Sequence, residues 1–147
     1  MKVVKKVLTD AYILEPSIFN DERGYFYESF NQKVFCSLIE KNINFVQDNQ
    51  SLSSKGTLRG LHFQKSPNAQ SKLVRVVQGS IYDVAVDLRV DSPTFKKSFA
   101  IEISAENKLQ FFIPKGFAHG FLSLEDNSII SYKVDNYYSK NDDGGIK

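Results

Sequence analysis

Four side chains in this sequence have the chemistry needed to move a proton to and from carbon. The two histidines, His62 and His119, each lie in a largely apolar segment, Lys72 opens the run KLVRVV, and Tyr132 lies in IISYKV. A histidine side chain with an ordinary pKa of about 6.5 is a base at neutral pH, and a phenol with a pKa of about 10 keeps its proton. A base, an acid and a lysine cation together can remove a proton beside a carbonyl, stabilise the enolate and return a proton.

Each of these residues also has a structural interpretation. A histidine among apolar residues is often a core residue whose ring is hydrogen-bonded. Lys72 would then be an edge-strand charge that prevents unwanted pairing, and Tyr132 a core ring with a bonded hydroxyl. For each residue taken alone, the structural interpretation is favoured. The presence of a histidine, a lysine and a tyrosine together favours a site for proton transfer.

The segment around His62 predicts a local irregularity. Residues 57–64 read TLRGLHFQ and are strand-like, with Arg59 and His62 three residues apart. In a regular strand these two side chains would point to opposite faces. Because isolated glycines in strands often mark bulges, a bulge at Gly60 is expected to bring Arg59 and His62 to one face.

A metal site is a weaker interpretation of the two histidines. The spacing Pro-x-Gly-x-x-His, from Pro114 to His119, resembles the second metal motif of the cupin jelly rolls. The first cupin motif needs His-x-His followed by a glutamate, but this chain has His62, Phe63 and Gln64. At most two imidazoles remain, and no spacing identifies the further ligands of a stable site. No metal is therefore expected.

The composition excludes several classes of protein. The 147 residues are 24% charged with a formal net charge of +2, and the only cysteine is Cys36. This charge gives no argument for nucleic-acid or membrane binding, and one cysteine excludes an internal disulfide framework. No stretch resembles a signal peptide or a membrane span. A single folded domain in the cytoplasm is expected.

The expected elements are mostly strands. Twelve Phe and seven Tyr favour pleated surfaces. One short amphipathic helix is expected after an N-cap at Asn31, with Val34, Phe35, Leu38 and Ile39 on the face that packs on a sheet. From Gln47 onward, short strands alternate with turns, which is typical of a sandwich or barrel. About ten short strands in two sheets, closed into a jelly roll, are expected. The strand expected at 81–88 has one apolar face, with Tyr82, Val84, Val86 and Leu88, and one mixed face, with Ile81, Asp83, Ala85 and Asp87.

Five dense segments carry a resemblance to a known family. They are DERGYFYE at 21–28, QDNQS at 47–51, GTLRGLHFQ at 56–64, QSKLVRVVQG at 70–79 and PKGFAHGF at 114–121. In this order they resemble the dTDP-4-dehydrorhamnose 3,5-epimerase family, and the similarity runs from about Tyr12 to the end of the chain. The resemblance implies an all-β, cupin-like double-stranded β-helix over residues 1–147, with the short helix near its N-terminus.

The resemblance also implies an activity and catalytic residues. Members of this family invert C3 and C5 of a dTDP-linked 4-keto-6-deoxy sugar by proton transfer, without a cofactor, in the rhamnose biosynthesis that serves cell-surface polysaccharide. By position, His62 resembles the general base, Tyr132 the acid on the opposite face and Lys72 the cation beside the C4 oxygen. His119 resembles a substrate ligand near the same oxygen.

Further positions resemble the residues that hold the nucleotide sugar. The family members are homodimers that exchange N-terminal strands. Arginines suit diphosphate oxygens because of their fork geometry. The implied substrate-binding positions are Arg23, Phe26, Glu28, Gln47, Asn49, Arg59, His119, Phe121 and Asp143, with Phe26 and Phe121 as pocket walls.

Two departures from the family leave alternatives open. The family base is paired with an aspartate from a C-terminal segment, and this chain stops at Lys147 before any such segment. Asp83 or Asp87 is a candidate substitute, although no spacing supports either. Asp143 replaces a glutamate and has a shorter reach. The alternatives are a catalytically weak sugar-nucleotide-binding module, an epimerase acting at C3 only and, less favoured, a metal-dependent cupin oxygenase.

Overall fold

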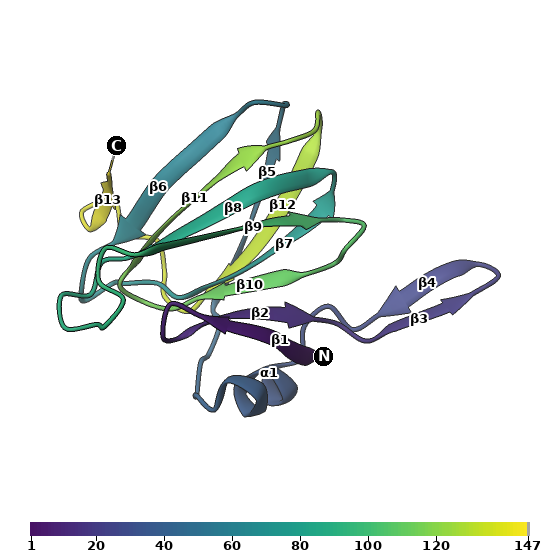
Figure 1. Ribbon diagram of the computed structural model, residues 1–147, viewed down its shortest axis with the longest axis horizontal. Helices are drawn as coiled ribbons and strands as arrows, with labels where there is room; N and C mark the ends of the chain where they lie inside the picture. Colours follow the sequence, from purple (N-terminus) through teal and green to yellow (C-terminus); the bar gives the residue numbers. More distant parts are fainter. Residues whose placement is uncertain (147) are drawn as a thin grey trace.

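Two antiparallel sheets face each other in the computed structural model, which describes residues 1–146 (Figure 1). The six-stranded sheet has the order β1-β2-β10-β7-β12-β5 and the five-stranded sheet the order β13-β6-β11-β8-β9. The first contains β1 (Lys2–Val7), β2 (Ala11–Glu15), β5 (Gln47–Ser53), β7 (Lys72–Gln78), β10 (Gln110–Ile113) and β12 (Ser128–Val134). The second contains β6 (Leu58–Gln64), β8 (Ser80–Asp87), β9 (Ser98–Ser104), β11 (Phe117–Ser123) and β13 (Asp143–Gly145). The predicted jelly roll is confirmed.

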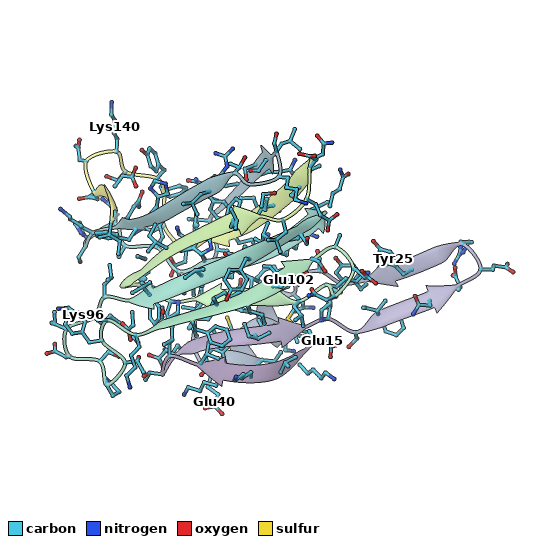
Figure 2. The ribbon with its side chains drawn as sticks, turned by 45° about the horizontal axis from the view of Figure 1, so that its top comes forward. Glu15, Tyr25, Glu40, Lys96, Glu102 and Lys140 are labelled. Atoms are coloured by element: carbon cyan, nitrogen blue, oxygen red, sulfur yellow. The ribbon has the colours of Figure 1, made fainter. Side chains whose placement is uncertain are left out.

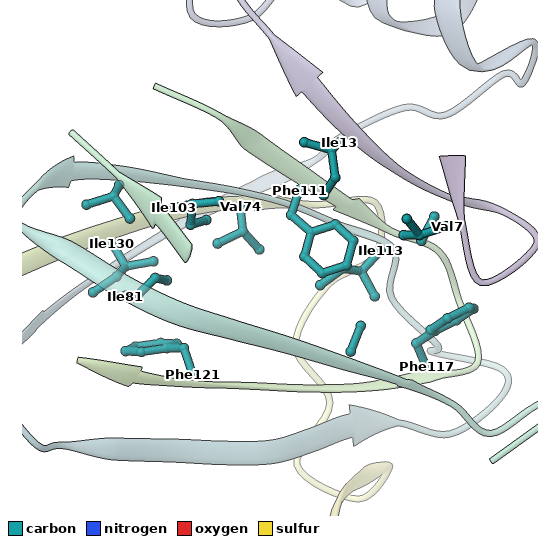
Figure 3. Close-up of a cluster of buried hydrophobic side chains, with 13 residues drawn as sticks. Val7, Ile13, Val74, Ile81, Ile103, Phe111, Ile113, Phe117, Phe121 and Ile130 are labelled. Carbon is teal, nitrogen blue, oxygen red and sulfur yellow. The ribbon is translucent and has the colours of Figure 1, made fainter. Parts of the chain in front are cut away.

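The main hydrophobic core lies between the two sheets. Both sheets supply inward-facing residues at every second position, as the pleat of a strand dictates. Figure 3 shows this packing, with Phe111 and Val74 from the six-stranded sheet and Phe121 and Ile81 from the five-stranded sheet. The apolar side chains of these two faces hold the sheets together. The cavity described below lies where polar side chains of the two sheets meet instead.

The mixed face of β8 is the one that points into the core. Asp83 and Asp87 are fully buried, whereas Tyr82 on the opposite, apolar face is 46% exposed. Hydrophobicity alone would orient this strand the other way. Both buried carboxylates have charged or polar partners, described below, and this pairing allows a charged group to be buried.

The single helix, α1 (Gln32–Ile39), forms as predicted. The side chain of Asn31 accepts a hydrogen bond from the backbone N–H of Val34 at 3.1 Å, which caps the first turn. Phe35 and Ile39 pack with Leu14, Leu73 and Phe112 in a second hydrophobic cluster, which places α1 against the outer face of the six-stranded sheet. Within residues 1–146, no helix is both long and apolar enough to cross a membrane.

A two-stranded hairpin projects away from the two sheets (Figures 1 and 2). It consists of β3 (Ile18–Asp21) and β4 (Gly24–Tyr27), which pair in an antiparallel arrangement. Phe19 and Phe26 are 65% and 72% exposed. An isolated hairpin is marginally stable in water. Within this chain, both rings are left largely uncovered.

Candidate active site

A cavity of about 720 Å³ lies where polar side chains of both sheets meet. The six-stranded sheet contributes Lys72 and Tyr132, and the five-stranded sheet contributes His62 and His119. The predicted base, acid, cation and C4-oxygen ligand therefore line one cavity. Its wall also includes five of the predicted substrate-binding residues: Gln47, Asn49, Arg59, Phe121 and Asp143.

The predicted bulge at Gly60 is confirmed. His62 pairs with His119 and Arg59 with Phe121, so three steps along β6 correspond to two along β11. Gly60 has a φ of +122°, and a Cβ at this position would lie 2.5 Å from the Cα of Gly120. Only glycine fits this close approach, which brings Arg59 and His62 to the same cavity.

Lys72 lies in the interior of its sheet, because β7 runs between β10 and β12. Its role as an edge-strand charge is therefore excluded. The Nζ atom lies 5.9 Å from the centre of the Tyr132 ring. Burial lowers the pKa of Lys72, and this effect is partly opposed by the negative charges of Asp83 and Asp143.

Tyr132 lies on the same face of β12 as the fully buried Ile130 and Val134. Burial raises the pKa of the Tyr132 hydroxyl, and a hydrogen bond with the Asn49 side chain opposes this shift in part. Asn49 lies directly opposite Tyr132 on β5. The phenol therefore keeps its proton at neutral pH, as a proton donor requires.

His119 is paired with one of the buried carboxylates of β8. Its Nε2 lies 2.6 Å from Oδ1 of Asp83, and both side chains are almost completely buried. The other buried aspartate, Asp87, forms an ion pair with Arg89. Within residues 1–146, Asp83 is thus bonded to His119 and Asp87 to Arg89, and neither carboxylate is hydrogen-bonded to His62.

Three predicted site residues lie outside this cavity in the chain. Arg23 is in the turn of the projecting hairpin, where its guanidinium pairs with Asp21. Phe26 is on β4, and Glu28 follows that strand. All three are exposed. The structure of a single chain does not bring them to His62.

The cavity also contains residues that the sequence reasoning missed. Tyr138 lines its wall with a side chain that is 58% exposed, and its hydroxyl lies 3.4 Å from Oδ2 of Asp143. Ser51, Gln64 and Gln70 also line it. The only sequence signal was a pair of tyrosines after the last long strand, and such a pair does not by itself indicate a site.

Potential metal ligands are not clustered. Among residues 1–146, no group of three or more His, Cys, Asp or Glu side chains is arranged to hold a metal ion. Gln64, at the position of the second histidine of the cupin His-x-His motif, uses its side chain to bond the backbone of Asn68 and Ser139.

Comparisons with known proteins place the chain in a family. The family model described as dTDP-4-dehydrorhamnose 3,5-epimerase matches residues 5–147. The chain belongs to the dTDP-4-dehydrorhamnose 3,5-epimerase family. The epimerase of Shigella flexneri is 55% identical over 146 residues, which are 99% of this chain and 81% of that protein.

Solved structures of epimerases have the same fold. The crystal structure of the enzyme from Elizabethkingia anophelis is 56% identical with a TM-score of 0.95, and the match covers 100% of this chain and 80% of that one. The enzyme of Legionella pneumophila, solved in complex with dTDP-4-keto-L-rhamnose, is 47% identical with a TM-score of 0.94, covering 99% and 77% of the two chains. The chain thus spans about four fifths of the length of these relatives.

Proposed function

We propose that this chain is a dTDP-4-dehydrorhamnose 3,5-epimerase, which inverts C3 and C5 of dTDP-4-keto-6-deoxyglucose to give dTDP-4-keto-L-rhamnose. The product serves rhamnose biosynthesis for cell-surface polysaccharide, and the cytoplasm is the proposed location. The single observation that carries the residue assignment is that one cavity holds His62, Lys72 and Tyr132. The similarity of the whole chain to epimerases of this name supports the substrate.

The proposed reaction is a proton transfer at each carbon. The C4 ketone acidifies the C–H bonds at C3 and C5, and His62 takes the proton from one of these carbons. The electron pair of that bond moves toward the C4 oxygen, and the ammonium of Lys72 stabilises the resulting enolate. The Tyr132 hydroxyl then gives its proton to the opposite face of the carbon, which inverts it. No electrons are lost, and no cofactor is needed.

His119 is proposed to hold the C4 oxygen together with Lys72. Because Nε2 of His119 lies 2.6 Å from the Asp83 carboxylate, Nδ1 is the ring nitrogen left to bond the sugar. A buried carboxylate fixes the orientation of the ring it bonds. Asp83 is therefore proposed to position the His119 ring so that an N–H at Nδ1 can donate to the C4 oxygen.

The nucleotide is proposed to lie toward β5 and the start of β6. Arg59 Nε donates to Ser53 Oγ at 3.0 Å and Nη2 donates to the Leu52 carbonyl at 3.2 Å. These bonds fix the guanidinium, whose fork suits diphosphate oxygens. Gln47 and Asn49 line the same wall, and Asp143 lines the cavity from β13. The exposed Tyr138 ring offers a surface on which a nucleobase can stack.

We propose a homodimer in which the β3–β4 hairpin of one protomer reaches the cavity of its partner. This arrangement brings Arg23, Phe26 and Glu28 to the substrate although they lie outside the cavity of their own chain. It also covers the exposed rings of a hairpin that is marginal alone. The same arrangement is compatible with residues 1–147 forming a single jelly-roll domain.

The test of the activity is deuterium incorporation from heavy water into dTDP-4-keto-6-deoxyglucose, followed by NMR at C3 and C5. Incorporation and inversion at both carbons are expected. Binding of dTDP without incorporation would instead support a binding module. Incorporation at C3 alone would support a single epimerase.

A mixing experiment tests the exchanged hairpin. Arg23→Ala and His62→Asn are each expected to have little activity as homodimers, because each leaves both cavities defective. A mixed dimer has one cavity with His62 and the intact hairpin of the partner, so unfolding and refolding the two variants together is expected to restore about a quarter of the wild-type activity, following the binomial share of mixed dimers. No gain over the separate variants would refute the exchange.

Replacing Tyr132 by phenylalanine tests the acid. The substitution removes one hydroxyl and keeps the ring beside Ile130 and Val134. We expect deuterium exchange at C3 to be spared more than inversion at C5, since exchange needs only the base while inversion needs a donor on the opposite face. General acid catalysis typically contributes about 10²-fold or more. The two rates are measured by NMR on one sample, and equal losses would contradict the assignment.

A further inference from the structure

A strap of the chain, residues 136–146, crosses from one sheet to the other beside the cavity. It follows β12 of the six-stranded sheet and ends in β13, which pairs with β6 of the five-stranded sheet (Figure 1). Two of its residues, Tyr138 and Asp143, line the cavity. Their positions depend on what fixes the strap, because β13 itself is only three residues long.

The buried end of Gln64 fixes the middle of the strap. Its side chain is 7% exposed. Its Oε1 accepts the backbone N–H of Ser139 at 2.8 Å, and its Nε2 donates to the carbonyls of Tyr137 and Asn68 at 3.2 and 2.6 Å. One side chain on β6 thus bonds the backbone on both sides of Tyr138.

A second set of bonds holds the strap from the solvent side. Oδ2 of Asp142 accepts hydrogen bonds from Asn68 Nδ2 at 2.7 Å and Ser139 Oγ at 2.6 Å. The Asp142 carbonyl accepts the backbone N–H of Lys65 at 2.9 Å. The strap and the turn after β6 are therefore joined around Gln64.

The cavity side of the strap is fixed by a predicted substrate-binding residue. Oε1 of Gln47 accepts the backbone N–H of Tyr138 at 3.2 Å, while Nε2 of Gln47 donates to Asn49 Oδ1 at 2.9 Å. Tyr138 is thus held between β5 and β6, which belong to different sheets. The Tyr138 hydroxyl in turn lies 3.4 Å from Asp143.

We propose that Gln64 is a positioning residue for nucleotide-sugar binding, which acts through Tyr138 and Asp143. All three of its hydrogen bonds go to backbone atoms, so it preorganises the strap. A strap that is already ordered loses less conformational entropy when the ligand binds. His62 and Lys72 are positioned by strand pairing, so Gln64 acts on affinity more than on the proton transfer. This inference rests on the proposed function.

The test replaces Gln64 by leucine, which keeps a similar volume and removes all three hydrogen bonds. We expect the Kd for dTDP, measured by calorimetry, and the KM of the sugar nucleotide each to rise about tenfold, which corresponds to about 1.4 kcal/mol. The kcat for deuterium exchange should stay within about threefold. The Ser139 amide is expected to lose protection from hydrogen exchange, while the amides of β7 keep theirs.

The matched control is Gln78→Leu. The Gln78 side chain donates a similar bond, to the Asn127 carbonyl at 3.0 Å in a turn, and does not line the cavity. Its Kd is expected to match the wild type. Asp142→Ala, on the solvent side of the strap, gives a second variant if Gln64→Leu does not fold, and a rise in Kd of about threefold is expected, because only two side-chain bonds are lost.

Each outcome decides one of the two proposals. An unchanged Kd in a folded Gln64→Leu protein, or in Asp142→Ala if the first does not fold, would overturn the positioning role. So would a loss of kcat at unchanged KM. Lack of deuterium exchange in the wild type would instead overturn the proposed activity, and the Kd for dTDP and the Ser139 protection would still test the role of Gln64.

Discussion

Replacing His62 by asparagine is expected to slow deuterium exchange at both C3 and C5 by about 10³-fold, the middle of the range for a general base. A single base is proposed for the two carbons, so both rates should fall together. The side chain of His62 is exposed on β6 and is smaller after substitution, so the strand pairing with β11 should be kept. The Kd for dTDP, measured by calorimetry, should change less than threefold. Exchange is followed by NMR in heavy water.

His119→Asn is the matched control, because it removes the other histidine of the same cavity. His119 is bonded to Asp83 and is proposed to bind the substrate. Its loss is therefore expected to raise KM and to slow exchange less than the loss of His62. If His119→Asn abolished exchange while His62→Asn kept more than a tenth of it, the two roles would have to be reversed.

Local patterns carried much of the prediction. The cap at Asn31 and the face of α1 depend on residues within one or two turns, and both are confirmed. The bulge at Gly60 followed from the need to bring Arg59 and His62 to one face, and the register of β6 against β11 shows it. The cap and the bulge each depend on residues that are close together in the sequence, and for this reason they could be predicted from it.

Side-chain pairs between residues far apart in the sequence could not be predicted in this way. The burial of the mixed face of β8 depends on His119 and Arg89, which meet Asp83 and Asp87 only in the folded chain. Composition favoured the opposite face, because the energy of a buried ion pair does not appear in a hydrophobicity pattern. For the same reason, the sequence offered Asp83 only as a candidate partner of His62 and gave no sign of its hydrogen bond with His119.

The strap shows another limit of the sequence. Gln64 was noted as the residue that replaces the second histidine of a metal-binding motif, and Tyr138 was not considered. The bonds of Gln64 reach Tyr137 and Ser139, more than seventy positions along the chain. No periodicity or spacing predicts such a contact. The residues proposed to touch the substrate were therefore easier to predict from the sequence than those that hold them in place.

Asp87 combines a buried charge with an unusual number of hydrogen bonds. Oδ2 accepts bonds from Arg89, Ser92 and Thr94 at 2.6 to 2.8 Å, and Oδ1 accepts two more from Arg89. Arg89 also bonds Asp10, in the turn between β1 and β2. This network joins the end of β8 to the opposite sheet. Burial alone would raise the pKa of Asp87, but the bonds from Arg89, Ser92 and Thr94 hold it well below its usual value.

Replacing Asp87 by asparagine is expected to lower the free energy of unfolding at pH 7 by about 3 kcal/mol, the typical cost of breaking a buried ion pair. Because the folded pKa of Asp87 is depressed, its contribution is full above the unfolded pKa of about 3.9 and is lost as the pH falls below it. The difference between wild type and variant should therefore shrink between pH 5 and pH 2. Urea unfolding at several pH values measures this difference.

The control is Asp126→Asn, at an exposed carboxylate that accepts one bond, from the Lys55 N–H at 2.9 Å. This substitution is expected to change the free energy of unfolding by less than about 1 kcal/mol at every pH, as most surface substitutions do. If Asp87→Asn lowers the free energy of unfolding equally at pH 7 and pH 3, the shape of the side chain, and not its charge, holds the two sheets together at this end. A decrease in the free energy of unfolding that is confined to neutral pH would assign that role to the ion pair with Arg89, which then fixes the end of β8.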